Sequence, residues 1–190
     1  MHSRNCAVRR YRISRRDGQI IRGFLMYSKI LVPVDGSDTS TAGLVEAIKI
    51  AKAQGSQLRL VHIVNEFILD YTYSPGIYAD NLIESLRKAG RTLLDGAQAL
   101  VQRSGISPEC VLIESIGGAA ADLILAQAQE WHADLIIMGT HGRRGLARLA
   151  LGSDAEQVVR AATVPVMLVR GKPKQEKNPA TATLVKTAAA

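Results

Sequence analysis

The chain has 190 residues, of which 47% are hydrophobic and 22% are charged. These values suit one soluble globular domain with a core of its own and leave little room for a second domain. No apolar run approaches the ~18 residues that a membrane-spanning helix needs, and the 2 cysteines are too few for a disulfide framework. We therefore expect a cytoplasmic protein that has no membrane partner.

The net charge of +7 resides at the two ends of the chain. Residues 1–25 and 171–190 are both rich in Lys and Arg, whereas residues 26–170 contain slightly more acids than bases. We expect residues 1–25 to be a basic extension that is disordered or not translated, with an anion-binding arm as the alternative. We expect residues 171–190 to be a disordered tail. Because the basic residues lie outside the domain at 26–170, nucleic acid is not an expected partner.

Within residues 26–170, short apolar runs alternate with amphipathic segments. The apolar runs predict five strands, at residues 29–35, 58–64, 110–113, 134–138 and 163–169. The amphipathic segments predict helices that end near Gln54, Gly105, Trp131 and Ala161. The alternation predicts an α/β fold, a single doubly wound open parallel sheet with helices on both faces.

Three finer expectations accompany these elements. The first helix, which takes its N-cap from residues 36–40, should bury Ala42, Val45 and Ile48. Residues 65–80 should form an irregular insertion that could act as a lid. Cys110 should be a small buried residue in its strand.

The loop after the fourth strand carries glycines at positions 139, 142 and 152, and the last of these precedes a predicted helix. Glycine lets main-chain N–H groups approach an anion closely, and a helix start adds free N–H groups. Ser153 could donate to a phosphate, or it could form a capping box with Glu156. The alternative for the glycines is that they only form turns. The chain has neither a P-loop nor a GxGxxG after the first strand, which argues against those two nucleotide-binding classes.

Two motifs give the chain a specific resemblance. The segment Ile30-Leu-Val-Pro-Val-Asp-Gly-Ser37, together with Gly139-x2-Gly142-x9-Gly152-Ser153, resembles the universal stress protein family over about residues 27–170. The glycine spacing is that of the ATP-binding members. The resemblance implies strand order 3-2-1-4-5 and a homodimer joined through the last strand, Val164–Val169. It also implies an ATP-binding regulator of the stress response with little or no catalytic turnover.

The resemblance carries site residues onto this chain. The expected nucleotide contacts are Pro33, Val34, Asp35, Ile63, Met138, Gly139, Gly142, Arg143, Gly152, Ser153 and Asp154. The first three would border the nucleoside, the main chain of Ile63 would meet the adenine edge, and the others would surround the ribose and phosphates. Asp154 would repel the phosphates unless Mg²⁺ or Mn²⁺ lay between them. No catalytic residue and no metal site made by the protein alone is expected.

Two other functions stay open at this point. One is a slow ATPase or a nucleotidyl-transfer enzyme, although no general base is recognisable. The other is a dimeric interaction module that needs no nucleotide. Two histidines are interpreted as structural: His62 should be a satisfied core residue, and His141 should face solvent, with a phosphate contact as its alternative.

Overall fold

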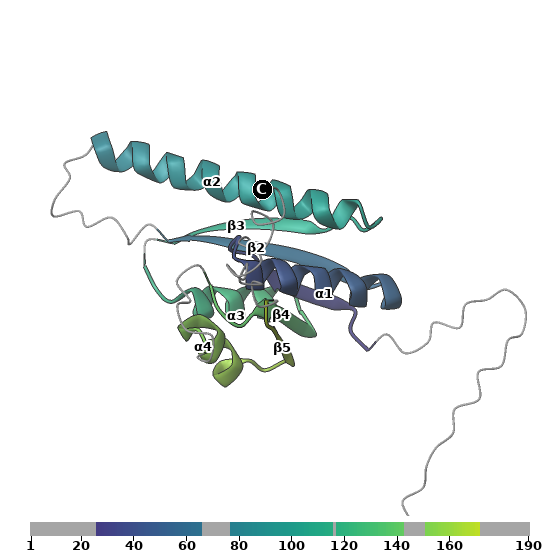
Figure 1. The fold of residues 1–190 in the computed structure, drawn as a ribbon. Coiled ribbons are helices and arrows are strands. Elements are labelled where there is room, and N and C mark those ends of the chain that lie inside the picture. The colour runs from purple at the N-terminus through teal and green to yellow at the C-terminus, as the bar shows by residue number, and fades with distance from the viewer. Residues whose placement is uncertain (1–25, 66–76, 116, 143–150, 172–190) are drawn as a thin grey trace, which may run out of the picture.

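The computed structural model describes residues 26–65, 77–115, 117–142 and 151–171. These residues form one sheet layer between two helix layers (Figure 1). The elements in chain order are β1 (Lys29–Pro33), α1 (Asp38–Gln54), β2 (Gln57–Asn65), α2 (Ile77–Gln102), β3 (Glu109–Ser115), α3 (Ala120–Glu130), β4 (Leu135–Gly139), α4 (Ser153–Ala161) and β5 (Val166–Val169). All strand pairs are parallel and the order is β3-β2-β1-β4-β5. The predicted fold class and strand order are therefore confirmed.

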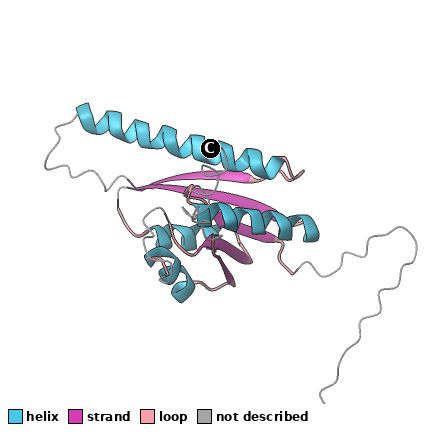
Figure 2. Ribbon diagram, in the orientation of Figure 1, coloured by secondary structure: helices cyan, strands magenta, loops and turns pink. Residues whose placement is uncertain are grey.

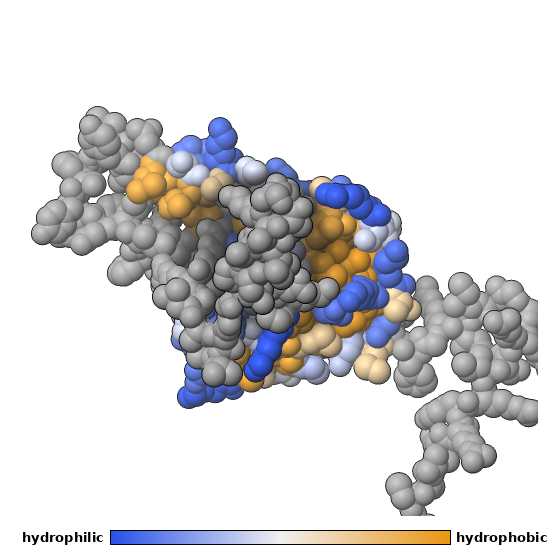
Figure 3. Space-filling model, viewed as in Figure 1, coloured by the Kyte–Doolittle hydropathy of each residue, from blue (hydrophilic) through white to orange (hydrophobic). Residues whose placement is uncertain are grey.

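The strands bury side chains on both faces of the sheet. Ile30 and Val32 pack into a core with α1 and α2, whereas Leu31, which lies between them, packs into a second core with α3. This alternation follows from the two-residue period of a strand. Figure 2 shows the strands between the two helix layers. In the space-filling view, hydrophobic surface remains visible between α2 and α1, near the carboxyl ends of both helices (Figure 3).

Three finer expectations were wrong in whole or in part. In α1, Ile48 is buried as predicted, but the other buried positions include Leu44, Ala47 and Ala51, and Val45 is 38% exposed, because the face toward the sheet is rotated from the predicted one. The helix α2 begins at Ile77, so the end of the predicted irregular insertion is helical, and residues 66–76 lie outside the described part. Cys110 is exposed, because β3 is an edge strand of the sheet.

The strands β1 and β4 lie side by side at the centre of the sheet. The chain continues from β1 to β2 on one side and from β4 to β5 on the other side. This arrangement makes a topological switch point, where parallel α/β sheets bind ligands outside the carboxyl ends of the strands. The loops after Pro33 and Gly139 therefore meet at this edge. Among the described helices, none is long and apolar enough to cross a membrane.

Candidate functional site

Asp35 follows β1 and is fixed in a tight turn. Its Oδ1 accepts a hydrogen bond from the Ser37 amide at 2.9 Å, and its own amide donates to Ser40 Oγ at 3.2 Å. An aspartate that binds the main chain two residues ahead stabilises such turns locally. The Asp35 carboxylate is half-buried. It is thus held at the carboxyl edge of the sheet before any ligand arrives.

The start of α1 is satisfied by its own side chains. Ser37 is the N-cap, and its Oγ accepts a hydrogen bond from the Ser40 amide at 3.1 Å. This agrees with the prediction that residues 36–40 supply the cap. The Thr39 hydroxyl donates to the main-chain carbonyl of His141. The first turn of α1 is therefore bound to the loop that follows β4.

The glycine loop comes directly against Asp35. A Cβ placed on Gly142 would lie 2.8 Å from Asp35 Oδ2, which is closer than real contacts allow. The Gly152 amide donates to the Thr140 carbonyl at 2.9 Å, and this bond joins the two ends of the loop. The structure thus brings together three residues that the sequence predicted, Asp35, Gly142 and Gly152, at the switch point.

Gly139 has a different reason to be glycine. A Cβ at this position would lie 2.7 Å from the Ser40 nitrogen and 2.7 Å from the Thr39 carbonyl carbon. Both are main-chain atoms of the first turn of α1, so neither can move away cheaply. Close packing of α1 on the end of β4 is therefore enough to explain this glycine, with or without a ligand.

The start of α4 has no side-chain cap. The N-cap is Gly152 and makes no side-chain hydrogen bond, while Ser153 is the first helical residue and is exposed. The Glu156 carboxylate pairs with Arg160 at 2.8 Å. The capping box that the sequence allowed is therefore not formed. The Ser153 hydroxyl is not used as a cap, and the positive end of the α4 dipole lies beside the glycine loop.

The remaining predicted contacts differ in how they could touch a ligand. The side chains of Val34 and Met138 are 5% and 7% exposed and belong to the core, so these residues can offer mainly main-chain atoms. Pro33 and Ile63 are half-buried, and Asp154 is exposed in the first turn of α4. Arg143 lies outside the described residues.

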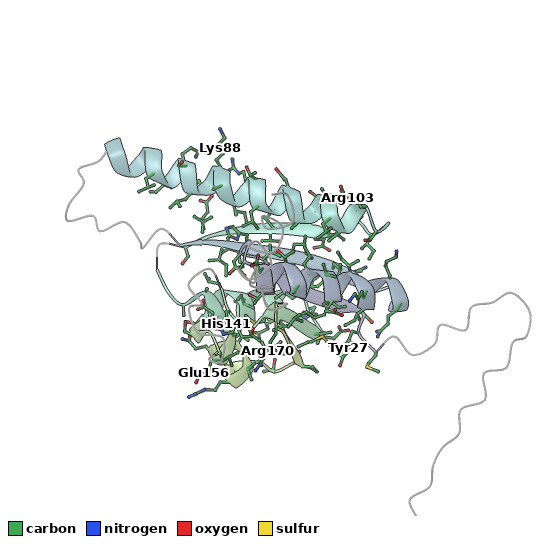
Figure 4. All side chains as sticks on the ribbon, in the orientation of Figure 1. Tyr27, Lys88, Arg103, His141, Glu156 and Arg170 are labelled. Atoms are coloured by element: carbon green, nitrogen blue, oxygen red, sulfur yellow. The ribbon has the colours of Figure 1, made fainter. Side chains whose placement is uncertain are left out.

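The two histidines near the site gave opposite outcomes. His62 is buried and its Nδ1 lies 2.6 Å from the Val34 carbonyl oxygen, which confirms a satisfied core residue. His141 is half-buried: its Nδ1 lies 2.9 Å from Thr140 Oγ1, and its Nε2 is shielded from solvent. The expectation that His141 faces solvent was wrong. Figure 4 places His141 at the end of the sheet away from Tyr27, which precedes β1.

Charged groups at the amino ends of the strands are paired with one another. Glu109 Oε2 lies 2.6 Å from Arg59 Nη2, and Glu109 Oε1 accepts from Trp131 Nε1 at 3.3 Å. The Arg59 guanidinium also lies 4.8 Å from the centroid of the Trp131 ring. Hydrogen bonding to Arg59, above all, lowers the pKa of Glu109, partly opposed by desolvation. These interactions make a self-contained structural cluster rather than a ligand site.

Two other features set limits on the site. In the part of the chain that the structure describes, no group of three or more His, Cys, Asp or Glu residues could hold a metal ion. A hollow of about 590 Å³ lies between α3, α4 and the segment that leads into β5, where Leu125, His132 and Val164 line it. It is far from the carboxyl ends of the strands, so the fold gives it no part in the crevice at the switch point.

When the chain that forms this doubly wound sheet and glycine loop is compared with known proteins, one family matches. Residues 26–170 match the universal stress protein family. The universal stress protein MJ0531 of Methanocaldococcus jannaschii is 36% identical over 159 residues, which cover 83% of this chain and 90% of that protein. The chain therefore belongs to the universal stress protein family.

Two similar solved structures contain a nucleotide. One is a universal stress protein in complex with cAMP, with 25% identity, a TM-score of 0.54, and coverage of 77% of this chain and 98% of that chain. The other is the universal stress protein from Archaeoglobus fulgidus in complex with dAMP, with 26% identity, a TM-score of 0.53, and coverage of 75% and 98%.

Proposed function

We propose that this protein binds an adenine nucleotide, with ATP as the expected ligand, in the crevice between the Asp35 turn and the glycine loop, and that it acts as a regulator with little or no turnover. The observation that carries the proposal is that Gly142 lies against Asp35: a Cβ there would come within 2.8 Å of Asp35 Oδ2, so a side chain at this position would displace the carboxylate. The cAMP and dAMP complexes of similar proteins support the choice of adenine nucleotide.

The two walls of the crevice suit different parts of the ligand. Asp35 would accept hydrogen bonds from ribose hydroxyl groups or the adenine amine, and the Ile63 main chain would meet the adenine edge. On the other wall, the Gly142 amide and the amide and hydroxyl of Ser153 would serve phosphate at the start of α4. The Gly152 amide is bound to Thr140, so Gly152 would contribute close main-chain approach rather than a free donor. Asp154 stands in the same turn and repels phosphate, so Mg²⁺ or Mn²⁺ bound by phosphate oxygens would relieve this repulsion.

Calorimetric titration of nucleotide-free full chain with ATP tests the proposal. The wild type should bind in the micromolar-to-millimolar range, and Gly142→Val should bind about 100-fold more weakly, the equivalent of losing one or two charge-assisted hydrogen bonds. Gly96→Ala is the matched control: a Cβ there meets nothing within 4 Å, so ATP affinity should not change. Lack of ATP binding by the wild type would refute the proposal. Phosphate release by the wild type above background, together with its loss in Asp35→Asn, would favour the enzyme alternative.

We also propose a homodimer that forms through the last strand, Val164–Val169. The strand β5 pairs only with β4 among the described strands and is therefore an edge of the sheet. Val166 and Leu168 are half-buried and Met167 is 36% exposed. An open apolar edge of this kind favours association with another chain. Light scattering should give twice the monomer mass for the wild type and the monomer mass for Met167→Lys; an unchanged mass in the variant argues against this interface.

A further inference from the structure

The three main-chain groups that lead into the Asp35 turn are each held by a different partner. The Val34 amide donates to the Val61 carbonyl at 2.8 Å, and the Val34 carbonyl oxygen lies 2.6 Å from His62 Nδ1. The Asp35 amide donates to Ser40 Oγ at 3.2 Å. Of these partners, only the histidine is a side chain that reaches across from the neighbouring strand.

The His62 contact occurs where the β1–β2 ladder stops. Pro33 pairs with Val61 as the last register pair. In a parallel ladder the next bond would run from the Ile63 amide to the Val34 carbonyl, and that bond is not formed between these two described residues. The imidazole binds the carbonyl instead. Because a carbonyl oxygen only accepts hydrogen bonds, Nδ1 of His62 must carry the proton.

The imidazole is also fixed from its other side. His62 is 7% exposed. A Cβ placed on Gly90 of α2 would lie 2.9 Å from His62 Cδ2, so the backbone of α2 packs directly over the ring. The ring has no space to turn away from Val34. The contact is therefore a rigid link between α2, β2 and the turn that carries Asp35.

We propose that His62 is a positioning residue of the nucleotide site. Its Nδ1–H holds the Val34 carbonyl, so that β1 separates from β2 after Pro33 and the Asp35 carboxylate stands against Gly142. The same separation leaves the Ile63 main chain without a β1 partner, on the side of β2 where it can meet the adenine edge. This inference rests on the proposed function, and it adds a residue that makes no ligand contact of its own.

Two substitutions separate the hydrogen bond from the packing of the ring. His62→Asn places a side-chain N–H near the position of Nδ1, whereas His62→Leu fills similar space without a donor. Leu112→Ala is the matched control, because Leu112 Cδ1 also lies 2.9 Å from a Cβ placed on Gly90 and its loss weakens packing under α2 without touching Val34. If His62→Leu does not fold, His62→Phe, which keeps a ring without a donor, replaces it.

Calorimetry with ATP and amide NMR of the ligand-free full chain are the two readouts. His62→Leu should weaken ATP binding about tenfold, the cost of leaving a buried carbonyl unpaired, and should shift the amide signals of Asp35 and Ile63. His62→Asn should bind within about threefold of wild type, and Leu112→Ala should keep wild-type affinity although it unfolds more easily.

Wild-type affinity in His62→Leu, or equal losses in the Leu and Asn variants, would overturn the inference. If even the wild type fails to bind ATP, the proposed function is wrong, and the NMR readout then decides the positioning role by itself. Amide shifts at Asp35 in His62→Leu but not in His62→Asn support that role, and unchanged shifts in both variants reject it.

Discussion

The helices α1 and α4 both begin beyond the carboxyl ends of the two central strands, yet their first turns are built in different ways. The start of α1 is capped by Ser37, and its turn is closed further by Asp35 and Ser40. At the start of α4 the N-cap residue is Gly152, so no side chain caps the helix, and Ser153 is exposed. One helix start has a side-chain cap supplied by the protein, while the other has none.

Under the proposed function, this difference gives separate roles to the two walls of the crevice. The α1 wall is rigid, because Thr39 and Ser40 pack against Gly139 and hold the Asp35 turn. The α4 wall offers amides and a dipole to an anion. Substitutions of the α1 cap and of Gly139 should therefore mainly affect stability, whereas those of Asp35 and of the α4 wall should mainly affect binding.

The largest effect expected on stability is that of Gly139→Ala. Its Cβ would meet the main chain of Thr39 and Ser40 at 2.7 Å, so overpacking should lower the free energy of unfolding by about 2–3 kcal/mol. Urea unfolding measures this change. Gly96→Ala, on an open helix surface, should instead be stabilised by about 0.5–1 kcal/mol. A Gly139→Ala protein as stable as wild type would show that α1 does not press on β4 as described.

A pair of serine substitutions should distinguish the role of the α1 start in stability from that of the α4 start in binding. Ser37→Ala removes the α1 cap and should lower the free energy of unfolding by about 1 kcal/mol. Ser153→Ala removes no cap, so its stability should stay within about 0.3 kcal/mol of wild type, while ATP affinity should fall about fivefold through loss of one hydrogen bond. Urea unfolding and calorimetry measure the two quantities. Equal destabilisation by both substitutions would remove the distinction.

The smallest expected effect on the free energy of unfolding is that of the Glu109–Arg59 pair at the amino end of the sheet. This region has no proposed ligand role and serves as a reference. Because Arg59 lowers the pKa of Glu109 in the folded protein, the pair stabilises the fold above the usual glutamate pKa, and this contribution is lost as the pH falls through the lowered value. The Glu109 side chain is 53% exposed, so screening limits the contribution to about 0.5 kcal/mol.

Thermal unfolding of Glu109→Gln against pH checks this expectation. The variant should be slightly less stable than wild type at pH 7, and the difference should fade in acid. Its ATP affinity should equal that of wild type. A difference that grows toward low pH would have the wrong sign.

The sequence predicted the sheet well, because alternating apolar runs and amphipathic segments report directly on buried strands and covering helices. It also located the α1 cap, since Ser37 lies in a short polar segment between a strand and a helix. For α4 the sequence left two roles open for Ser153, because a shift of one residue in the helix start decides which residue caps. The structure makes Gly152 the cap, with its amide bound to Thr140.

Other features depend on contacts between distant segments and leave little signal in a single sequence. Gly139 looks like a loop glycine until α1 is packed against it, and His62 looks like an ordinary strand residue until the Val34 carbonyl is placed beside it. The rotated face of α1 was missed because small residues such as Ala42 and Ala47 fit either face.

The most direct test of the two-wall account is an NMR titration of the ¹⁵N-labelled full chain with ATP. The account predicts that the amides of Gly142, Gly152, Ser153 and Asp154 shift most, and that the amides of Ser40 and Thr41, in the first turn of α1, keep their ligand-free positions. Shifts that concentrate at the start of α1, or in the hollow between α3 and α4, would contradict it.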